Sequence, residues 1–352
     1  MQSNKRELAR HPLEERVRRF LLTLPCAVQG RSLLVGVSAG ADSLALLHVL
    51  AALRAVLDLR LVAVYIDHGL RPLEIPAEWA CVRAAGARLE VEVLREQVQV
   101  HEFAALGLSP EQAAREARYQ ALFRLLAERE ADFVVVAHTE DDQVEEVLLR
   151  LIRGGGRKAL SGMRPCSGRV LRPLLGLRKA ELLAYLADLG VVHCHDSSND
   201  DPRFLRNRVR NELLPLLESR YDPGVRRAVL KTAANLAEDE DLLESLLDAH
   251  WDEVVREEPG TDGDSPAWRL RRAPFRALHP GLRRRLVERL LWRLRARARY
   301  EQILAVVRAG CTGRTGSELH LSQGLRVRVE RDTLLFCYPA GRGSWRGRLD
   351  FP

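Results

Sequence analysis

Residues 33–47 have the sequence LLVGVSAGADSLALL, and this stretch decides the fold. A run of apolar residues ends at Val37, a turn of small residues follows, and apolar residues then recur at helical spacing. This order predicts a buried strand, a tight loop and the start of a helix. The small side chains of Ser38, Gly40 and Ser43 let backbone N–H groups approach a ligand closely, and a helix N-terminus favours phosphate. A strand–helix turn with ordinary capping residues is the alternative.

The composition is that of a globular protein with about two or three domains. The chain has 352 residues, of which 46% are hydrophobic, and a formal net charge of +7. It holds 51 arginines and only four lysines. Excess positive charge favours a nucleic-acid partner, because arginine grips phosphate and stacks on bases. A codon bias that replaces lysine by arginine explains the arginine preference equally well, so the net charge is the more useful signal.

The sequence does not favour a membrane protein, a secreted protein or a protein with a metal cluster. No apolar run approaches the about 18 residues of a membrane span, and the charged N-terminal residues 1–24 do not resemble a signal peptide. We therefore expect a cytoplasmic protein without a membrane partner. The six cysteines contain no Cys-x-x-Cys pair, which argues against zinc ribbons, iron–sulfur sites and a disulfide framework. His193, Cys194 and His195 alternate along an expected strand, so they do not converge on one metal.

Apolar strands alternate with segments of helical length in the first two thirds of the chain. Strands are expected at residues 32–37, 61–67, 89–94, 133–138 and 191–193. Such alternation predicts an α/β fold, a doubly wound parallel sheet covered by helices on both faces. Ligands of these sheets bind beyond the C-terminal ends of the strands, where Ser38, His68 and His138 fall.

The alternation stops near Pro215, which suggests a change of domain. We expect a catalytic domain at residues 1–217, a helical domain at 218–310 that binds RNA, and a small β-rich segment at 311–352. Residues 259–266 are expected to form a polar loop, and strands are expected at 318–321 and 325–329. A basic run at 283–299 marks either the solvated face of a helix or a surface for RNA.

Two further segments place charged side chains at helix starts. Arg115 and Arg118 share a helix face, so they can clamp polyphosphate or RNA, or pair with nearby glutamates. Asp141 and Asp142 lie where a helix follows the fourth strand. Adjacent carboxylates beside a phosphate loop form a plausible Mg²⁺ site, and simple N-capping is the alternative. The basic turn at 206–210 grips phosphate or forms a solvated face.

Residues 38–43 resemble the Ser-Gly-Gly-x-Asp-Ser signature of the PP-loop ATP pyrophosphatases, with Ala39 in place of the first glycine. Further blocks follow in order, and together they resemble the tRNA(Ile)-lysidine synthases over about residues 30–217. These blocks are Asp67 to Pro72, Ala114 to Tyr119, Ala137-His138 with Asp141-Asp142-Gln143 and Glu145, Leu148 to Leu151, Arg172-Pro173-Leu174, and Asp196, Ser198, Asn199 and Asp201 with Arg206-Asn207-Arg208 and Arg210.

The resemblance implies that ATP activates the wobble cytidine of an isoleucine tRNA with a CAU anticodon, and that free L-lysine then displaces AMP to form lysidine. It implies ATP as co-substrate, Mg²⁺ as cofactor and a possible homodimer. We expect ATP to bind at Ser38, Ala39, Gly40, Ala41, Asp42, Ser43, His68 and His138. Catalysis is expected from Asp42, Asp141, Asp142, Arg208 and Arg210, with Mg²⁺ at Asp141 and Asp142. The tRNA is expected to contact Arg115, Arg118, Arg206 and Asn207.

Two other functions stay open at this point. A PP-loop tRNA thiolase shares the ATP chemistry, but it usually relies on paired cysteines or a cluster that this sequence lacks. A non-catalytic RNA-binding protein could use the arginine surface alone, and it gives no reason for a phosphate loop and an acid pair to occur together.

Overall fold

The computed structural model describes residues 11–69, 73–99, 110–194, 201–258 and 267–338. The chain divides into two compact units, Met1–Leu236 and Ala237–Phe351. The domain boundaries expected at 217 and 310 stay predictions, and the sheet of the second unit takes strands from both sides of residue 310. No helix in the described ranges combines the length and the apolar character that crossing a membrane requires.

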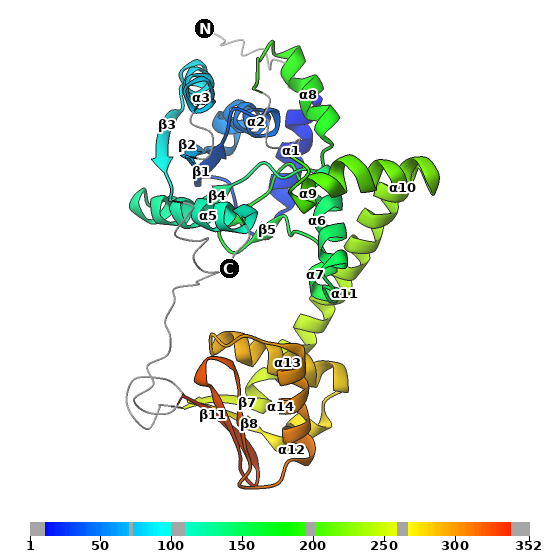
Figure 1. Ribbon diagram of the computed structural model, residues 1–352. Helices are drawn as coiled ribbons and strands as arrows, with labels where there is room; N and C mark the ends of the chain where they lie inside the picture. The colour runs from blue at the N-terminus through cyan, green and yellow to red at the C-terminus, as the bar shows by residue number, and fades with distance from the viewer. Residues whose placement is uncertain (1–10, 70–72, 100–109, 195–200, 259–266, 339–352) are drawn as a thin grey trace. The chain divides into compact units, whose positions relative to one another are not determined.

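A six-stranded sheet forms the centre of the first unit, in the order β3-β2-β1-β4-β6-β5 (Figure 1). All neighbouring strands are parallel except the edge pair β5 and β6. The strand order reverses direction between β1 and β4, and such a reversal point is where open α/β sheets bind ligands. The strands are β1 (Ser32–Val37), β2 (Arg60–Asp67), β3 (Glu92–Gln97), β4 (Phe133–Val135), β5 (Cys166–Ser167) and β6 (Val170–Leu171).

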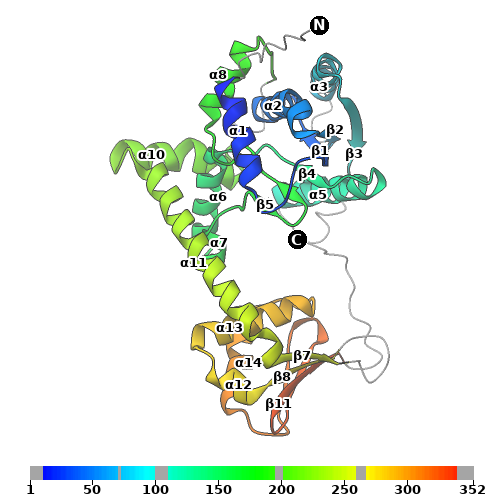
Figure 2. The same cartoon turned by 180° about the vertical axis from the view of Figure 1, so that it is seen from behind.

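Helices cover both faces of this sheet, as the alternation of strands and helices predicts. Leu33 and Val35 pack into a core with residues of α1 (Pro12–Thr23), α2 (Ala41–Leu57), α3 (Ile75–Leu89) and α8 (Lys179–Asp188). Leu34, which points to the other face, packs with α5 (Pro110–Glu128). The view from behind likewise shows α1 and α2 on one side of the sheet and α5 on the other (Figure 2). The doubly wound fold is therefore confirmed.

Three of the expected strands differ from the structure. The fourth ends at Val135 instead of residue 138. The third strand begins at Glu92, because α3 continues to Leu89. The prediction of a strand at 191–193 is wrong. Val192 is 84% exposed, and Cys194, just after the segment, donates a hydrogen bond from its N to Ala39 O over 2.9 Å. Val170 and Leu171 supply the next strand beside β4 instead.

A small helical layer follows the acid-rich helix α6 (Glu140–Ile152). It contains α7 (Arg157–Leu160), α9 (Leu205–Arg208), a π-helical turn (Val209–Leu213) and α10 (Leu214–Arg220). Val144 and Leu148 of α6 pack against Val209 and Leu214 in one apolar cluster. This cluster fixes the chain at 205–220 against α6, so charged residues of the two segments can meet.

The second unit contains an antiparallel sheet in the order β7-β8-β11-β10-β9. The strands β9 (Glu318–His320) and β10 (Arg326–Val329) confirm the two expected at its C-terminal end, and β11 (Thr333–Cys337) adds a third. The helices expected at 218–310 are interrupted by two strands, β7 (Val255–Glu258) and β8 (Ala267–Arg271). Helix α11 (Val225–Val254) begins in the first unit, and its residues from Ala237 onward belong to the second unit. The other helices of the second unit are α12 (Arg272–Ala277), α13 (Pro280–Arg293) and α14 (Tyr300–Thr312). The loop expected at 259–266 lies outside the described residues.

Several arginines of the basic run at 283–299 point to α11 instead of forming a solvated face. Arg285 makes a two-pronged ion pair with Glu240, whose side chain is fully buried. Arg289 binds Asp248, and the guanidinium of Arg293 lies 4.3 Å from the ring centre of Trp251. The acidic and basic stretches of the sequence are thus partners within one unit.

Candidate active site

Residues 38–43 form a closed loop between β1 and α2, and Ser43 holds it together. The Ser43 hydroxyl lies 2.7 Å from Ser38 O and 2.9 Å from Gly40 O, and it accepts a hydrogen bond from Ser38 N over 3.0 Å. Ala39 is buried and has no positive φ, so alanine replaces glycine there without backbone strain. The loop presents its backbone at the start of a 17-residue helix, whose N-terminus favours an anion.

We expect Ser43→Ala to raise the KM for ATP about tenfold and to lower the free energy of unfolding by about 1–2 kcal/mol. The substitution removes the hydroxyl that closes the loop and leaves Ser38 N without its acceptor. Nucleotide titration and chemical denaturation measure the two effects. Ser245→Ala, on the exposed face of α11, is the matched control. An unchanged KM for ATP in the Ser43 variant would remove this loop from the ATP site.

Asp42, in the first turn of α2, carries an unsatisfied carboxylate. Its Oδ1 is buried without a hydrogen-bond partner, and its Oδ2 lies 3.8 Å from Lys179 Nζ. Burial raises the pKa of Asp42 to about 6, with Lys179 opposing the shift and the carboxylates of Asp142 and Asp141 adding to it. A free buried carboxylate oxygen beside a phosphate-binding loop is a natural ligand for a cation.

Asp142 both caps its own helix and binds an arginine. Its Oδ2 accepts hydrogen bonds from Thr139 N and Oγ1, which completes a capping box at the start of α6. Its Oδ1 accepts a hydrogen bond from Arg206 Nη2 over 3.1 Å. Although burial acts in the opposite direction, Arg206 and these hydrogen bonds keep the pKa of Asp142 below its usual value. One carboxylate oxygen of Asp142 therefore caps the helix, as the capping alternative predicts, and the other oxygen binds Arg206.

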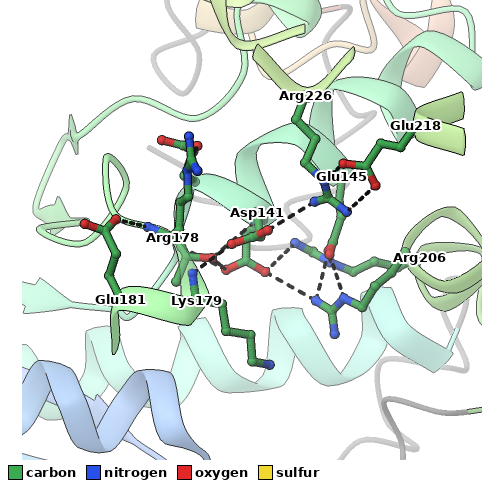
Figure 3. A network of polar contacts seen from close by, with 12 residues as sticks. Asp141, Glu145, Arg178, Lys179, Glu181, Arg206, Glu218 and Arg226 are labelled. Atoms are coloured by element: carbon green, nitrogen blue, oxygen red, sulfur yellow. Dashed lines mark hydrogen bonds and ion pairs between the residues drawn. The ribbon is translucent and has the colours of Figure 1, made fainter. Parts of the chain in front are cut away.

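Asp141 faces a different set of partners, as Figure 3 shows. Its Oδ2 accepts a hydrogen bond from the backbone N of Lys179 over 2.8 Å, and its Oδ1 accepts one from Arg226 Nη1 over 3.1 Å. Arg226 is held in turn by Glu218, whose Oε1 lies 2.7 Å from Arg226 Nε. The two adjacent acids thus belong to two neighbouring sites, with Asp142 on the side of Arg206 and Asp141 on the side of α8 and α11.

A buried glutamate organises the basic turn at 206–210. The Glu145 side chain is 2% exposed and accepts hydrogen bonds from Arg206 Nε (2.9 Å), Arg210 Nε (2.6 Å) and Arg210 Nη2 (2.9 Å). The structure therefore brings Arg206 and Arg210 to the acid helix. Arg208 lies halfway between them in sequence and points away, 58% exposed and 3.8 Å from Glu212. Asn207 is buried and donates to Asp201 O over 2.9 Å.

The remaining predicted residues line the sheet edge next to this network. Arg118 Nη2 lies 3.3 Å from His68 Nε2, and the Arg115 guanidinium lies 5.2 Å from the Tyr119 ring centre. Burial lowers the pKa of His138 well below its usual value, against the attraction of Asp142, so this imidazole is neutral. Residues 70–72 and 196–199 of the resembling blocks lie outside the described residues.

A pocket of about 440 Å³ opens beside Asp141. Its lining includes Glu140, Asp141, Lys179, Glu218, Arg226 and Arg227. Acidic and basic side chains thus face one space, which suits a ligand that carries both signs of charge. Across the described part of the chain, no group of three or more His, Cys, Asp or Glu side chains could hold a metal ion without further ligands.

The PP-loop domain family matches residues 10–217 of this chain. A tRNA(Ile)-lysidine synthase of Leifsonia xyli subsp. xyli is 42% identical over 261 residues, which cover 73% of this chain and 75% of the relative. The chain belongs to the tRNA(Ile)-lysidine synthase family. A family member of Nitratidesulfovibrio vulgaris is 36% identical over 319 residues, covering 86% of this chain and 90% of its own length.

A solved structure supports the same fold outside the family. The U34-tRNA thiolase of Methanococcus maripaludis, solved with its [4Fe-4S] cluster, superposes with a TM-score of 0.53 at 19% identity. The superposition covers 64% of this chain and 78% of the thiolase. At this identity the likeness concerns the PP-loop fold alone.

Sequence reasoning missed several residues of the site. Glu145 falls within one of the resembling blocks without a role of its own, and Lys179, Glu218 and Arg226 lie in none of these blocks. Glu218 and Arg226 lie beyond the residues that match the PP-loop domain family, so the family signature could not point to them. Glu145 had a usable signal, because it lies three residues after Asp142 and therefore on the same helix face.

Proposed function

We propose that this protein joins free lysine to the wobble cytidine of a CAU-anticodon isoleucine tRNA at the expense of ATP. The convergence of the loop at 38–43 with the carboxylates of Asp42, Asp141 and Asp142 carries this proposal. A phosphate-binding loop beside an acid cluster suits a reaction that needs both a nucleotide and a cation. The identity of the substrates is inferred from the tRNA(Ile)-lysidine synthase family, to which the chain belongs.

The proposed reaction has two steps. The cytosine 2-oxygen attacks the α-phosphorus of ATP, and the bond to pyrophosphate breaks. The amine of lysine then attacks the activated carbon, AMP leaves with the oxygen, and the amine gives up its proton. Phosphoryl and adenylyl transfer depend mainly on positioning and charge neutralisation, so a protein that holds both substrates in a charged site can accelerate them.

The residues of the loop and of α5 are proposed to hold the nucleotide. Backbone N–H groups of 38–43 at the start of α2 would bind phosphate oxygens, while Arg115 and Arg118 reach the same sheet edge from α5. His68 and His138 lie where β2 and β4 end. Since His138 is neutral, it would act as a hydrogen-bonding group near the nucleotide and not as a counter-ion.

Magnesium is proposed to bind between the triphosphate and the acid cluster. Mg²⁺ in phosphate sites needs only one or two carboxylates, so the residues present fit the ion without a closed protein cage. Asp42 Oδ1 would be the first protein ligand, since it has no hydrogen-bond partner. Asp141 or Asp142 would reach the same ion by giving up an arginine contact. The ion would neutralise charge on the leaving pyrophosphate.

Lysine is proposed to occupy the pocket beside Asp141. The carboxylates of Glu140 and Asp141 suit its ammonium groups, and the arginines of the wall suit its carboxylate. The tRNA is proposed to approach from the side of Arg206, Asn207 and Arg208, of which Arg208 is the exposed member. A cytoplasmic location is proposed because tRNA, ATP and free lysine occur there, and a homodimer stays a prediction that mass measurement in solution tests.

Product analysis tests the proposed reaction. With ATP, Mg²⁺, lysine and the isoleucine tRNA transcript, we expect AMP and pyrophosphate in equal amounts, each dependent on the tRNA. Asp141→Asn should lower AMP release by about 10- to 100-fold, because one anchor of the cation or lysine is lost. Formation of ADP and phosphate, or full activity of the Asp141 variant, would contradict this assignment.

A further inference from the structure

The pocket beside Asp141 contains two adjacent arginines with different surroundings. Arg226 is fully engaged, because its Nε and Nη2 donate to Glu218 (2.7 and 3.4 Å) and its Nη1 donates to Asp141 (3.1 Å). Arg227 also lines the pocket, and its side chain is exposed. Arg227 has no hydrogen bond or ion pair within the ranges that the structure describes. One guanidinium at the pocket is therefore structural, and the next is available to a ligand.

The walls of the pocket differ in chemistry. Glu140, Asp141 and Glu218 contribute carboxylates, and Leu230 and Ala180 contribute apolar surface. Of the other cations in the lining, Arg178 pairs with Glu140 and Lys179 lies 3.8 Å from Asp42, whereas Arg227 is an unpaired cation within the described residues. A guanidinium binds a carboxylate through two parallel hydrogen bonds, and apolar surface suits a methylene chain. Carboxylates, apolar surface and an unpaired guanidinium around one pocket suit a free amino acid with a cationic side chain.

We propose that Arg227 binds the α-carboxylate of the lysine substrate and makes the enzyme specific for the free amino acid. This inference rests on the proposed function. Arg227 lies ten residues beyond the end of the PP-loop domain match at residue 217, so it adds a determinant from outside that domain. It acts on substrate choice, because binding of the carboxylate selects the free amino acid over an amine that lacks one.

The pairing of charges also explains why the pocket needs a second arginine. Arg226 neutralises Asp141 and Glu218, and without it the three carboxylates of the pocket would draw on Arg178, Lys179 and Arg227 instead. No cation would then be left over for a carboxylate ligand. Because Arg226 is paired, the charge of Arg227 remains available to the substrate. The charges of the pocket then favour a ligand with a carboxylate over a simple diamine.

Substrate pairs test this inference. We compare lysine with 1,5-diaminopentane, which has the same two amines and no carboxylate, on the unaltered protein and on Arg227→Ala. We expect Arg227→Ala to lower kcat/KM for lysine by about 10- to 100-fold and to leave kcat/KM for the diamine unchanged. Arg227→Lys should recover part of the loss. Arg153→Ala, an exposed arginine outside the pocket, is the matched control.

Three results would overturn the inference. An equal loss for both amines would show that Arg227 does not contact the carboxylate. A raised KM for tRNA with unchanged dependence on lysine would assign Arg227 to the RNA backbone instead. Absence of lysine transfer by the unaltered protein would overturn the proposed function together with this inference, whereas the first two results overturn the inference alone.

Discussion

Glu145→Ala is expected to lower the free energy of unfolding by about 3–5 kcal/mol, because it removes one partner of a buried ion-pair network. The Glu145 carboxylate accepts three hydrogen bonds from Arg206 and Arg210, and these arginine side chains are only 18% and 27% exposed. Without Glu145, Asp142 is the nearest carboxylate for both guanidinium groups. We therefore expect loss of activity as well, since Asp142 would be drawn into a new pairing.

Chemical denaturation measures the stability effect, and a second glutamate–arginine pair provides the control. Glu212 lies 3.8 Å from Arg208, with both side chains about 60% exposed. Exposed pairs contribute little, so Glu212→Ala should change the free energy of unfolding by less than about 1 kcal/mol. A Glu145→Ala protein as stable as the Glu212 variant would contradict the buried network.

Asp42→Asn is expected to stabilise the protein at neutral pH and to lower its activity by about 100- to 1,000-fold. The raised pKa of about 6 means that the folded protein holds the Asp42 proton more tightly than the unfolded chain does. Ionised Asp42 therefore costs stability above pH 6. Asparagine cannot ionise, so it removes this cost together with the carboxylate that the proposed Mg²⁺ site needs.

The pH dependence separates this effect from a general change in packing. At pH 7.5 we expect Asp42→Asn to gain about 1–2 kcal/mol, after allowance for the partial exposure of the side chain. The gain should shrink as pH falls from 6 to 4, because Asp42 then becomes protonated in the unaltered protein. Thermal denaturation across this range is the measurement, with the exposed Asp252→Asn as control. A gain that is constant with pH would contradict a strained Asp42 carboxylate.

Much of the first unit could be predicted because its signals are local. The apolar run at 33–37 with the small-residue turn after it determines β1, the loop and α2 without reference to the rest of the chain. The pattern of Val144, Val147 and Leu148 likewise predicts α6 and puts Asp141 and Asp142 in its first turn. A buried strand, or a helix with one buried face, has apolar residues at a characteristic spacing in the sequence.

The partners of the charged residues could not be predicted in this way. Whether Arg206, Arg208 or Arg210 meets the acid helix depends on which face of 205–213 packs against Val144 and Leu148. The same holds for Arg285, which binds Glu240 although a run of arginines usually faces solvent. The strand expected at 191–193 is wrong for a related reason, since the two valines fit a strand pattern while Val192 stays exposed.

Transfer of labelled lysine to tRNA tests the central claim most directly. The assay contains the protein, ATP, Mg²⁺ and an isoleucine tRNA transcript with a CAU anticodon, and a methionine tRNA with the same anticodon is the control. We predict label that resists mild alkali on the isoleucine tRNA alone. Label on neither tRNA, from folded protein that binds ATP, would contradict the account.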